Sequence, residues 1–287
     1  MFKYFIYKFG QFWVNVLPLK LSYRIAMLLS DLQYYFSFRD RRAVRNNLRI
    51  IAPAGSDLQK LSKEVFRNFG KYLVDFFSMA LKLDDQFIEQ NVKISNPEAL
   101  EQVLQNGKGG IVITGHIGNW ELGAMVISHL GYPLVAIALP HKERPVNDLF
   151  NQQRERQGIT IIPTSIAIRR CMESLKDNKF IAVVVDRDFA SHGVEIDFLG
   201  RKAMLPKGAV IFSYKTGAPI IPTFMVRETN DSFSLLILDP IYPQKVIDSE
   251  LDQETLISTM KKYLTLIEEM IRKYPTQWMM FREFWVT

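Results

Sequence analysis

Hydrophobic positions divide the chain into two regions of different periodicity. Up to about residue 90, apolar residues recur three and four positions apart, as in amphipathic helices. From about residue 91, short apolar runs of strand length alternate with helical patterns. Runs that are apolar on both faces are typical of strands buried between helices. We therefore expect an α/β fold with a mostly parallel central sheet flanked by helices, preceded by an N-terminal helical layer.

The two regions are expected to form one structural unit, a helical, membrane-associating region at 1–90 and an α/β catalytic domain at 91–287. In the first region, Pro53 and Gly55 break the chain before a helix that opens at Ser56-Asp57. In the second, the predicted strands are 110–114, 134–139, 159–162, 180–185, 220–226 and 233–238. Helices are predicted after Asn96-Pro97-Glu98, from Asn119, from Arg144-Pro145 to about Gly158, over 165–177, after Pro206 and over 249–273.

The first 20 residues alternate aromatic side chains with lysines. Their longest uncharged run, from Phe9 to Leu19, is eleven residues, whereas a membrane-spanning helix needs about twenty. No small-residue cleavage site follows, so a secretory signal is not predicted. The pattern favours a helix that lies in the membrane interface. An ordinary amphipathic helix packed on the body, or a poorly marked membrane anchor, is the alternative.

Charge favours an anionic partner. The chain has 36 Lys and Arg against 30 Asp and Glu, a net charge of +6, which suits phospholipid headgroups or an acidic carrier protein. Five arginines fall within eleven residues: Arg39, Arg41, Arg42, Arg45 and Arg49. This cluster fits contact with phosphate or phospholipid, and the alternative is a solvated helix face. No nucleic-acid recognition motif is present, so no nucleic-acid partner is expected. The lone cysteine, Cys171, excludes an internal disulfide and is interpreted as a small buried residue.

A candidate site follows the strand at 110–114. Glycines surround His116, Asn119 is a suitable helix N-cap, and Glu121 then falls in the first helical turn. This places a histidine and a carboxylate five residues apart at the carboxyl end of a buried strand, where α/β proteins bind ligands. Spacing alone is weak evidence, because His192 and Asp197 have the same separation.

Several motifs in a shared order resemble those of the lipid A late acyltransferase family, within the glycerolipid and lysophospholipid acyltransferases. They are Gly-His116-x4-Glu121, Arg41-Arg42-x2-Arg45-Asn46-Asn47-Leu48, Arg154-x-Arg156-x-Gly158, Val185-Asp186-Arg187-Asp188, Phe198-x-Gly200-Arg201, Gly217-Ala218-Pro219-Ile220-Ile221-Pro222 and Pro275-x-Gln277-Trp278. The chain is somewhat short for a lipid A enzyme, and Leu205-Pro206 stands where many relatives carry Thr. The acceptor is therefore open among a lipid A precursor, an aminolipid, a phospholipid and a glycolipid.

The resemblance implies direct acyl transfer from a thioester to a lipid hydroxyl or amine. His116 would be the general base and Glu121 would hold its tautomer. Backbone N–H groups from Gly115 to Asn119, Gly118 included, and Arg154 or Arg156 would stabilise the developing oxyanion, with Arg154 favoured. Asp186, at the end of another apolar strand, would be a further orienting group. Gly-x-Ser-x-Gly is absent, which counts against an α/β-hydrolase.

No cofactor is expected; acyl-acyl carrier protein or acyl-coenzyme A would be the cosubstrate. No metal is expected, because His129, His141 and His192 lack the spacing of a catalytic zinc site. We expect a monomer on the cytoplasmic face of a bacterial inner membrane, peripheral or with one N-terminal anchor, most favoured in lipid A or glycolipid synthesis. The alternatives are a lysophospholipid or aminolipid acyltransferase, a hydrolase that uses the same pair on water, and a non-catalytic lipid-binding protein.

Overall fold

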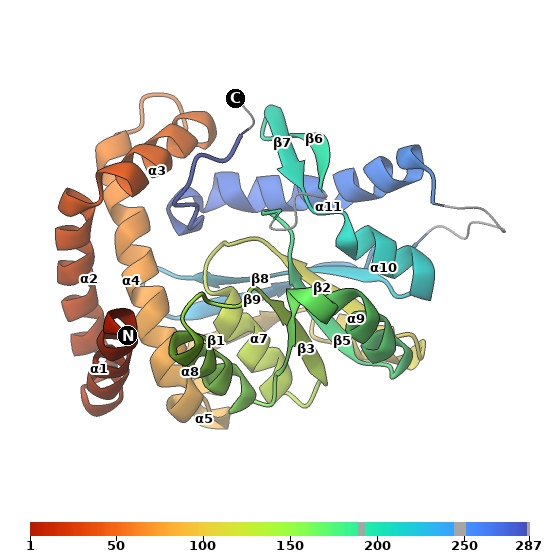
Figure 1. The fold of residues 1–287 in the computed structure, drawn as a ribbon, viewed down its shortest axis with the longest axis horizontal. Coiled ribbons are helices and arrows are strands. Elements are labelled where there is room, and N and C mark those ends of the chain that lie inside the picture. Colours follow the sequence, from red (N-terminus) through yellow and green to blue (C-terminus); the bar gives the residue numbers. More distant parts are fainter. Residues whose placement is uncertain (189–192, 244–250, 286–287) are drawn as a thin grey trace.

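The computed structural model describes residues 1–188, 193–243 and 251–285. Its N-terminal region is helical, as predicted, with α1 at Phe2–Val16, α2 at Leu19–Phe36, α3 at Phe38–Ile51, α4 at Leu58–Lys82 and α5 at Asp85–Asn91. Helix α4 begins where the sequence predicts, because the Asp57 carboxylate accepts hydrogen bonds from the amides of Gln59 and Lys60. Figure 1 shows α1, α2 and α4 side by side at one end of the α/β body.

Strands and helices alternate through the rest of the chain. The strands are β1 at Val92–Ser95, β2 at Gly110–Thr114, β3 at Leu134–Ala138, β4 at Thr160–Pro163, β5 at Phe180–Val184, β6 at Val194–Phe198, β7 at Arg201–Leu205, β8 at Ile220–Arg227 and β9 at Phe233–Ile237. The helices are α6 at Glu98–Gln105, α7 at Trp120–His129, α8 at Arg144–Glu155, α9 at Ala167–Lys176, α10 at Gly208–Thr216 and α11 at Gln253–Lys273. The last helix starts after its Asp252 cap, and positions 249 and 250 of its predicted start lie outside the described residues.

Seven strands form one sheet in the order β1-β9-β8-β2-β5-β3-β4. Within it, only the β8–β9 pair is antiparallel, which confirms the predicted mostly parallel sheet. Strand β1 and the separate β6–β7 hairpin are not among the predicted strands. The hairpin turn combines Gly200 with Leu199, both at positive φ. Leucine is an uncommon residue for that conformation, so the usual sequence signal of a tight hairpin turn is missing.

The sheet separates two apolar cores. Side chains alternate along β2, so that Ile111 and Ile113 join one core and Val112 joins the other. The first core includes residues of α3, α9, α10 and α11, and the second includes residues of α6, α7, α8 and the end of α4. Figure 1 shows α11 on one side of the sheet and α7 and α8 on the other. Both faces are covered, as expected for parallel strands.

The N-terminal helices carry a large apolar surface. None of the helices in the described residues has the length and apolarity that crossing a membrane requires. Large apolar side chains are nevertheless exposed along two helices, Phe5, Phe9, Phe12, Trp13 and Val16 on α1 and Leu28, Leu29, Leu32, Tyr35 and Phe36 on α2. Exposure of this extent is a property of surfaces that bind proteins or membranes.

Candidate active site

His116 and Asp186 meet at the carboxyl edge of the sheet. Thr114 of β2 pairs with Val184 of β5 in parallel register, so the residues two positions beyond each strand end lie side by side. The His116 ring Nδ1 is 2.6 Å from Asp186 Oδ1, and the His116 amide donates to Oδ2 at 2.8 Å. A carboxylate only accepts, so Nδ1 is assigned the proton and Nε2 is left as the acceptor.

The segment after α11 packs against the His116–Asp186 pair and bonds to it. The indole N–H of Trp278 donates to Asp186 Oδ2 at 2.9 Å. The same segment forms an antiparallel bridge with the site turn, because the Met279 amide donates to the His116 carbonyl at 2.8 Å and the Gly118 amide donates to the Gln277 carbonyl at 3.0 Å. Asp186 is fully buried beneath these contacts. Sequence reasoning quoted Trp278 only as part of a motif and assigned it no role.

Glu121 is the partner of Arg154 rather than of His116. Arg154 donates from Nε and Nη2 to the two Glu121 carboxylate oxygens, at 2.9 and 2.6 Å, and both side chains are nearly buried. This corrects the expected orienting role of Glu121. Glu121 lies in the first turn of α7 and bonds to Arg154, whereas the register of β2 and β5 brings Asp186 directly to the imidazole.

Arg154 is held as a cation by this arrangement. Burial works to lower the pKa of Arg154, but the Glu121 charge and its two hydrogen bonds outweigh burial and raise that pKa. The guanidinium also lies over the ring of Phe76 in α4. A permanently charged donor therefore stands in a largely apolar setting beside the site turn.

Gly118 and Asn119 shape the turn itself. Gly118 has φ +63°, and a Cβ there would lie 2.0 Å from the Met225 carbonyl oxygen, so only glycine fits. The Asn119 side chain caps α7 by accepting from the Leu122 amide at 3.0 Å, and the Asn119 backbone amide donates to the Met225 carbonyl at 2.7 Å. Gly118 and Asn119 are not among the described residues that line the cleft described below.

Three backbone donors of this turn are also occupied. The amides of His116, Gly118 and Asn119 all donate to protein acceptors. These three N–H groups are therefore not free for an oxyanion, contrary to the expectation from the sequence.

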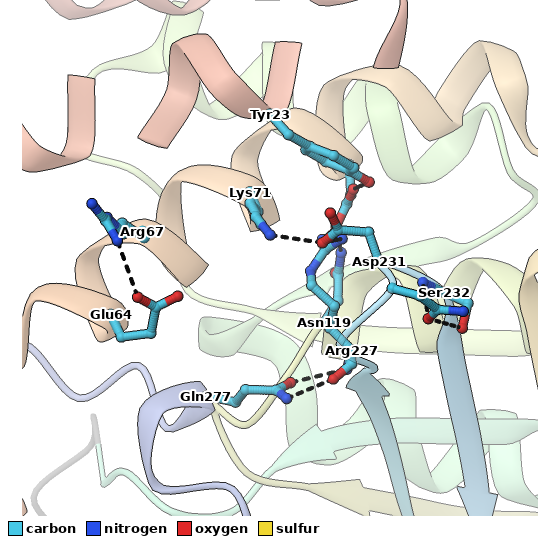
Figure 2. A network of polar contacts seen from close by, with 11 residues as sticks. Tyr23, Glu64, Arg67, Lys71, Asn119, Arg227, Asp231, Ser232 and Gln277 are labelled. Carbon is cyan, nitrogen blue, oxygen red and sulfur yellow. Dashed lines mark hydrogen bonds and ion pairs between the residues drawn. The ribbon is translucent and has the colours of Figure 1, made fainter. Parts of the chain in front are cut away.

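A buried polar network ties this turn to the helical layer. Asp75 of α4 is fully buried and accepts from Asn119 at 2.7 Å, from Tyr23 at 2.5 Å and from Arg227. Figure 2 shows Tyr23, Asn119 and Arg227 converging from α2, the site turn and β8, and Gln277 bonded to the backbone of Arg227. Sequence reasoning missed Asp75, which stands in a helix with no distinguishing local motif.

A cleft of about 890 Å³ opens beside the His116 ring. Its polar lining includes His116, Glu121 and Arg154, and it continues inward between α7 and the sheet past Ala124 and Ala136. The Trp120 ring, which also lines the cleft, stands edge to face with the His116 ring at 4.9 Å and stacks on Tyr72 at 4.6 Å. The site thus joins a histidine, a fixed cation and an apolar interior space.

The remaining candidates lie elsewhere. Arg156 caps the end of α8, is exposed, and is absent from the described residues that line the cleft, so the helix end directs only Arg154 to the site. His192 lies outside the described residues, and Asp197 pairs with Lys202 on the β6–β7 hairpin. Cys171 is buried in α9, as expected.

The chain belongs to the bacterial lipid A biosynthesis acyltransferases, whose family model matches residues 1–287. It is therefore an acyltransferase, as the motifs predict.

Two relatives are named phosphatidylinositol mannoside acyltransferases. One, from Mycolicibacterium smegmatis, is 23% identical over 248 residues, covering 84% of this chain and 78% of the relative. Another, from Mycobacterium tuberculosis, is 26% identical over 161 residues, covering 54% of this chain and 51% of the relative. Among solved structures, the 1-acyl-sn-glycerophosphate acyltransferase of Thermotoga maritima has 15% identity and a TM-score of 0.40, covering 86% of this chain and 97% of that one.

Proposed function

We propose that the protein transfers a fatty acyl chain from a thioester, carried by acyl carrier protein or coenzyme A, to a hydroxyl group of a membrane glycolipid. The observation that carries the proposal is the His116–Asp186 contact at 2.6 Å at the edge of a large cleft. Membership of the lipid A acyltransferase family and similarity to enzymes named for a mannosylated phospholipid support a glycolipid acceptor. A lysophospholipid or aminolipid acceptor is the alternative.

In the proposed reaction, His116 Nε2 takes the proton of the acceptor hydroxyl as its oxygen attacks the thioester carbonyl. The ester C–O bond forms, the C–S bond breaks, and the thiolate leaves and can recover the proton from the imidazolium. Asp186 stabilises that imidazolium through Nδ1. General-base catalysis of this kind contributes roughly 10²–10⁴ in rate.

Arg154 is the proposed donor to the thioester oxygen. Three of its N–H groups bond to Glu121 and Asn151, and a guanidinium has five, so two remain. Glu121 then acts by fixing the plane of the guanidinium. A preorganised charged donor in a poorly solvated site is worth more than the same donor in water.

The inner part of the cleft is the proposed place of the acyl chain. Ala124 of α7 and Ala136 and Ala182 of the sheet face it and remain partly accessible although they lie between a helix and the sheet. Nearly buried Ile127 and Leu134 stand farther along the same lining. Small apolar side chains leave room for an alkyl chain and offer it no polar group.

The exposed apolar faces of α1 and α2 are the proposed membrane contact. Helices that lie in the interface expose aromatic and aliphatic side chains on one side and carry lysines and arginines near the headgroups. Lys3, Lys8, Lys20 and Arg24 belong to the same two helices. The enzyme would then meet its lipid acceptor from the membrane surface, most favoured on the cytoplasmic face of the inner membrane.

The test uses purified protein, an acyl thioester and candidate lipid acceptors. His116→Ala should abolish transfer with an unchanged melting temperature, and retained turnover would refute the general-base role. Asp186→Asn should lose most of the rate. Mass spectrometry of total lipids from cells with and without the gene identifies the acceptor, because one lipid class should differ by one acyl chain.

A further inference from the structure

The carboxylate of Asp75 contacts the site turn at 115–119 from outside the cleft. Asp75 belongs to α4, is fully buried and is absent from the described residues that line the cleft. Its Oδ2 accepts from the Asn119 side chain at 2.7 Å and from the Arg227 guanidinium, and its Oδ1 accepts from the Tyr23 hydroxyl at 2.5 Å. Three donors from three elements thus fix the orientation of this carboxylate.

A closed ring of hydrogen bonds links Asp75 to the site turn by two branches. One branch is the direct bond to the Asn119 side chain. The other runs through Arg227, whose backbone N–H and carbonyl pair with the Gln277 side chain at 2.9 and 2.8 Å, as Figure 2 shows. The Gln277 carbonyl accepts from the Gly118 amide at 3.0 Å and so closes the ring.

Each branch ends directly before a tryptophan that supports His116. The first ends before Trp120, whose ring stands edge to face with the His116 ring at 4.9 Å. The second ends before Trp278, whose indole donates to Asp186, the carboxylate bonded to His116 Nδ1. The ring of contacts therefore fixes two independent supports of the imidazole.

Helix α4 supports the imidazole at a second position. Tyr72 stands three residues before Asp75, so both side chains leave the same face of the helix. Tyr72 is buried and stacks on Trp120 at 4.6 Å. One turn of α4 therefore holds two consecutive residues at the start of α7, Asn119 by a hydrogen bond and Trp120 by stacking.

Stability alone does not account for the charged pair in this network. Asp75 and the Arg227 side chain are both buried, and replacing a buried ion pair by apolar side chains is often neutral or stabilising. A buried polar network instead makes one arrangement of its neighbours rigid. The neighbours of this network are the two segments that contact His116.

We propose that Asp75 is a positioning residue that holds the His116 imidazole in its reactive orientation through Asn119 and Gln277. This inference rests on the proposed function, in which Nε2 must reach the acceptor hydroxyl. A displacement of about 1 Å at a reacting group costs roughly 100-fold in rate. Because Asp75, Asn119 and Gln277 are not among the described lining residues of the cleft, breaking the ring should lower kcat and leave KM largely unchanged.

Asn119→Ser breaks the ring most narrowly. Serine is a good helix N-cap and can still accept from the Leu122 amide, but it lacks the amide donor that bonds to Asp75. The variant should lose about 10- to 100-fold in kcat, with KM within about twofold of the wild type. Asp75→Asn should lose kcat in the same way and also melt at a lower temperature, because Arg227 is left buried without its partner.

The NMR signal of the His116 Nδ1 proton reports on the imidazole without turnover. This proton lies in the 2.6 Å contact with Asp186, and its signal is assigned by its absence from His116→Ala. The signal should shift or broaden in Asn119→Ser and in Asp75→Asn, since the supports of the ring are no longer fixed. Purified full-length protein serves for the spectra and for the kinetics.

The matched control is Tyr34→Phe. It removes a buried hydroxyl contact of 3.1 Å between Tyr34 of α2 and Ser62 of α4, and so weakens α4 without touching the site turn. It should keep the wild-type kcat and NMR signal even where its melting temperature falls. Wild-type kcat with an unmoved signal in Asn119→Ser, or an equal loss in Tyr34→Phe, would overturn the inference. A wild type without transfer would refute the proposed function alone, because the NMR comparison still judges the positioning role.

Discussion

The Trp278 indole and the His116 imidazole hold opposite oxygens of one buried carboxylate, Asp186. Burial works to raise the pKa of Asp186, but attraction by His116 and the hydrogen bonds from His116 and Trp278 outweigh it and lower that pKa. The tryptophan thus adds to the effect of His116 in favouring the ionised form of Asp186. A residue 162 positions away from the histidine in sequence therefore contributes to the electrostatics of the pair.

Trp278→Phe should therefore slow catalysis and shift its pH dependence. Phenylalanine keeps an aromatic ring but removes the N–H donor, so the pKa of Asp186 should rise and the acid limb of kcat should move to higher pH. Loss of a hydrogen bond to a charged group costs about 1.5–3 kcal/mol. If the transition state bears this cost, kcat should fall about tenfold or more.

The control is Trp285→Phe, which removes an indole donor to the Phe198 carbonyl in the same aromatic cluster. Its pH–rate profile should match the wild type. If Trp278→Phe changed stability alone, with an unshifted acid limb, Trp278 would have only a packing role.

The Glu121–Arg154 pair should be needed for rate as well as for stability. Either single change to Gln leaves a nearly buried charge without its partner, which costs about 3–5 kcal/mol of unfolding free energy. The double variant Glu121→Gln/Arg154→Gln removes both charges and should recover much of that stability. Because the proposed donor to the thioester oxygen is then missing, kcat should remain low.

Chemical denaturation and steady-state kinetics on the same four proteins separate these effects. Neutralising the exposed Arg169–Glu173 pair of α9 should leave both measurements unchanged. Wild-type kcat in the stable double variant would show that Glu121 and Arg154 serve the fold only.

Cys171 should take no part in the reaction. Burial raises the pKa of its thiol to about 12, so thiolate is scarce at neutral pH and a maleimide should label the native protein slowly. Cys171→Ala should keep wild-type kcat. Rapid labelling accompanied by loss of activity would instead point to an acyl-cysteine intermediate.

Membrane binding should depend on the apolar face of α2. Replacing the exposed Leu28, Leu29 and Leu32 by Ser should reduce co-sedimentation with liposomes, since each side chain contributes buried apolar area in proportion to its size. Replacing Lys261, Lys262 and Glu269, which are exposed positions of α11, by Ser provides the control. Equal sedimentation of both variants would remove α2 from the membrane contact.

The sequence predicts the alternating elements well because buried strands and amphipathic helices have distinct periodicities. It also places His116 and Asp186 at strand ends. What it cannot supply is the order of strands in the sheet, which is set by long-range pairing. That order makes β2 and β5 neighbours, so that His116 contacts Asp186. Local spacing had instead favoured Glu121 as the partner of the histidine. Asp75 has no local signal at all, because its partners come from three other elements.

The distances in sequence between His116, Asp186 and Trp278 also fix the order in which the enzyme can mature. During synthesis, α1 and α2 are made before the sheet, and the indole that bonds to Asp186 is made only after the whole sheet and α11. The helices of the proposed membrane contact are therefore made long before the residues of the site are complete. The His116–Asp186 pair gains the Trp278 hydrogen bond only when the segment after α11 packs on the site turn.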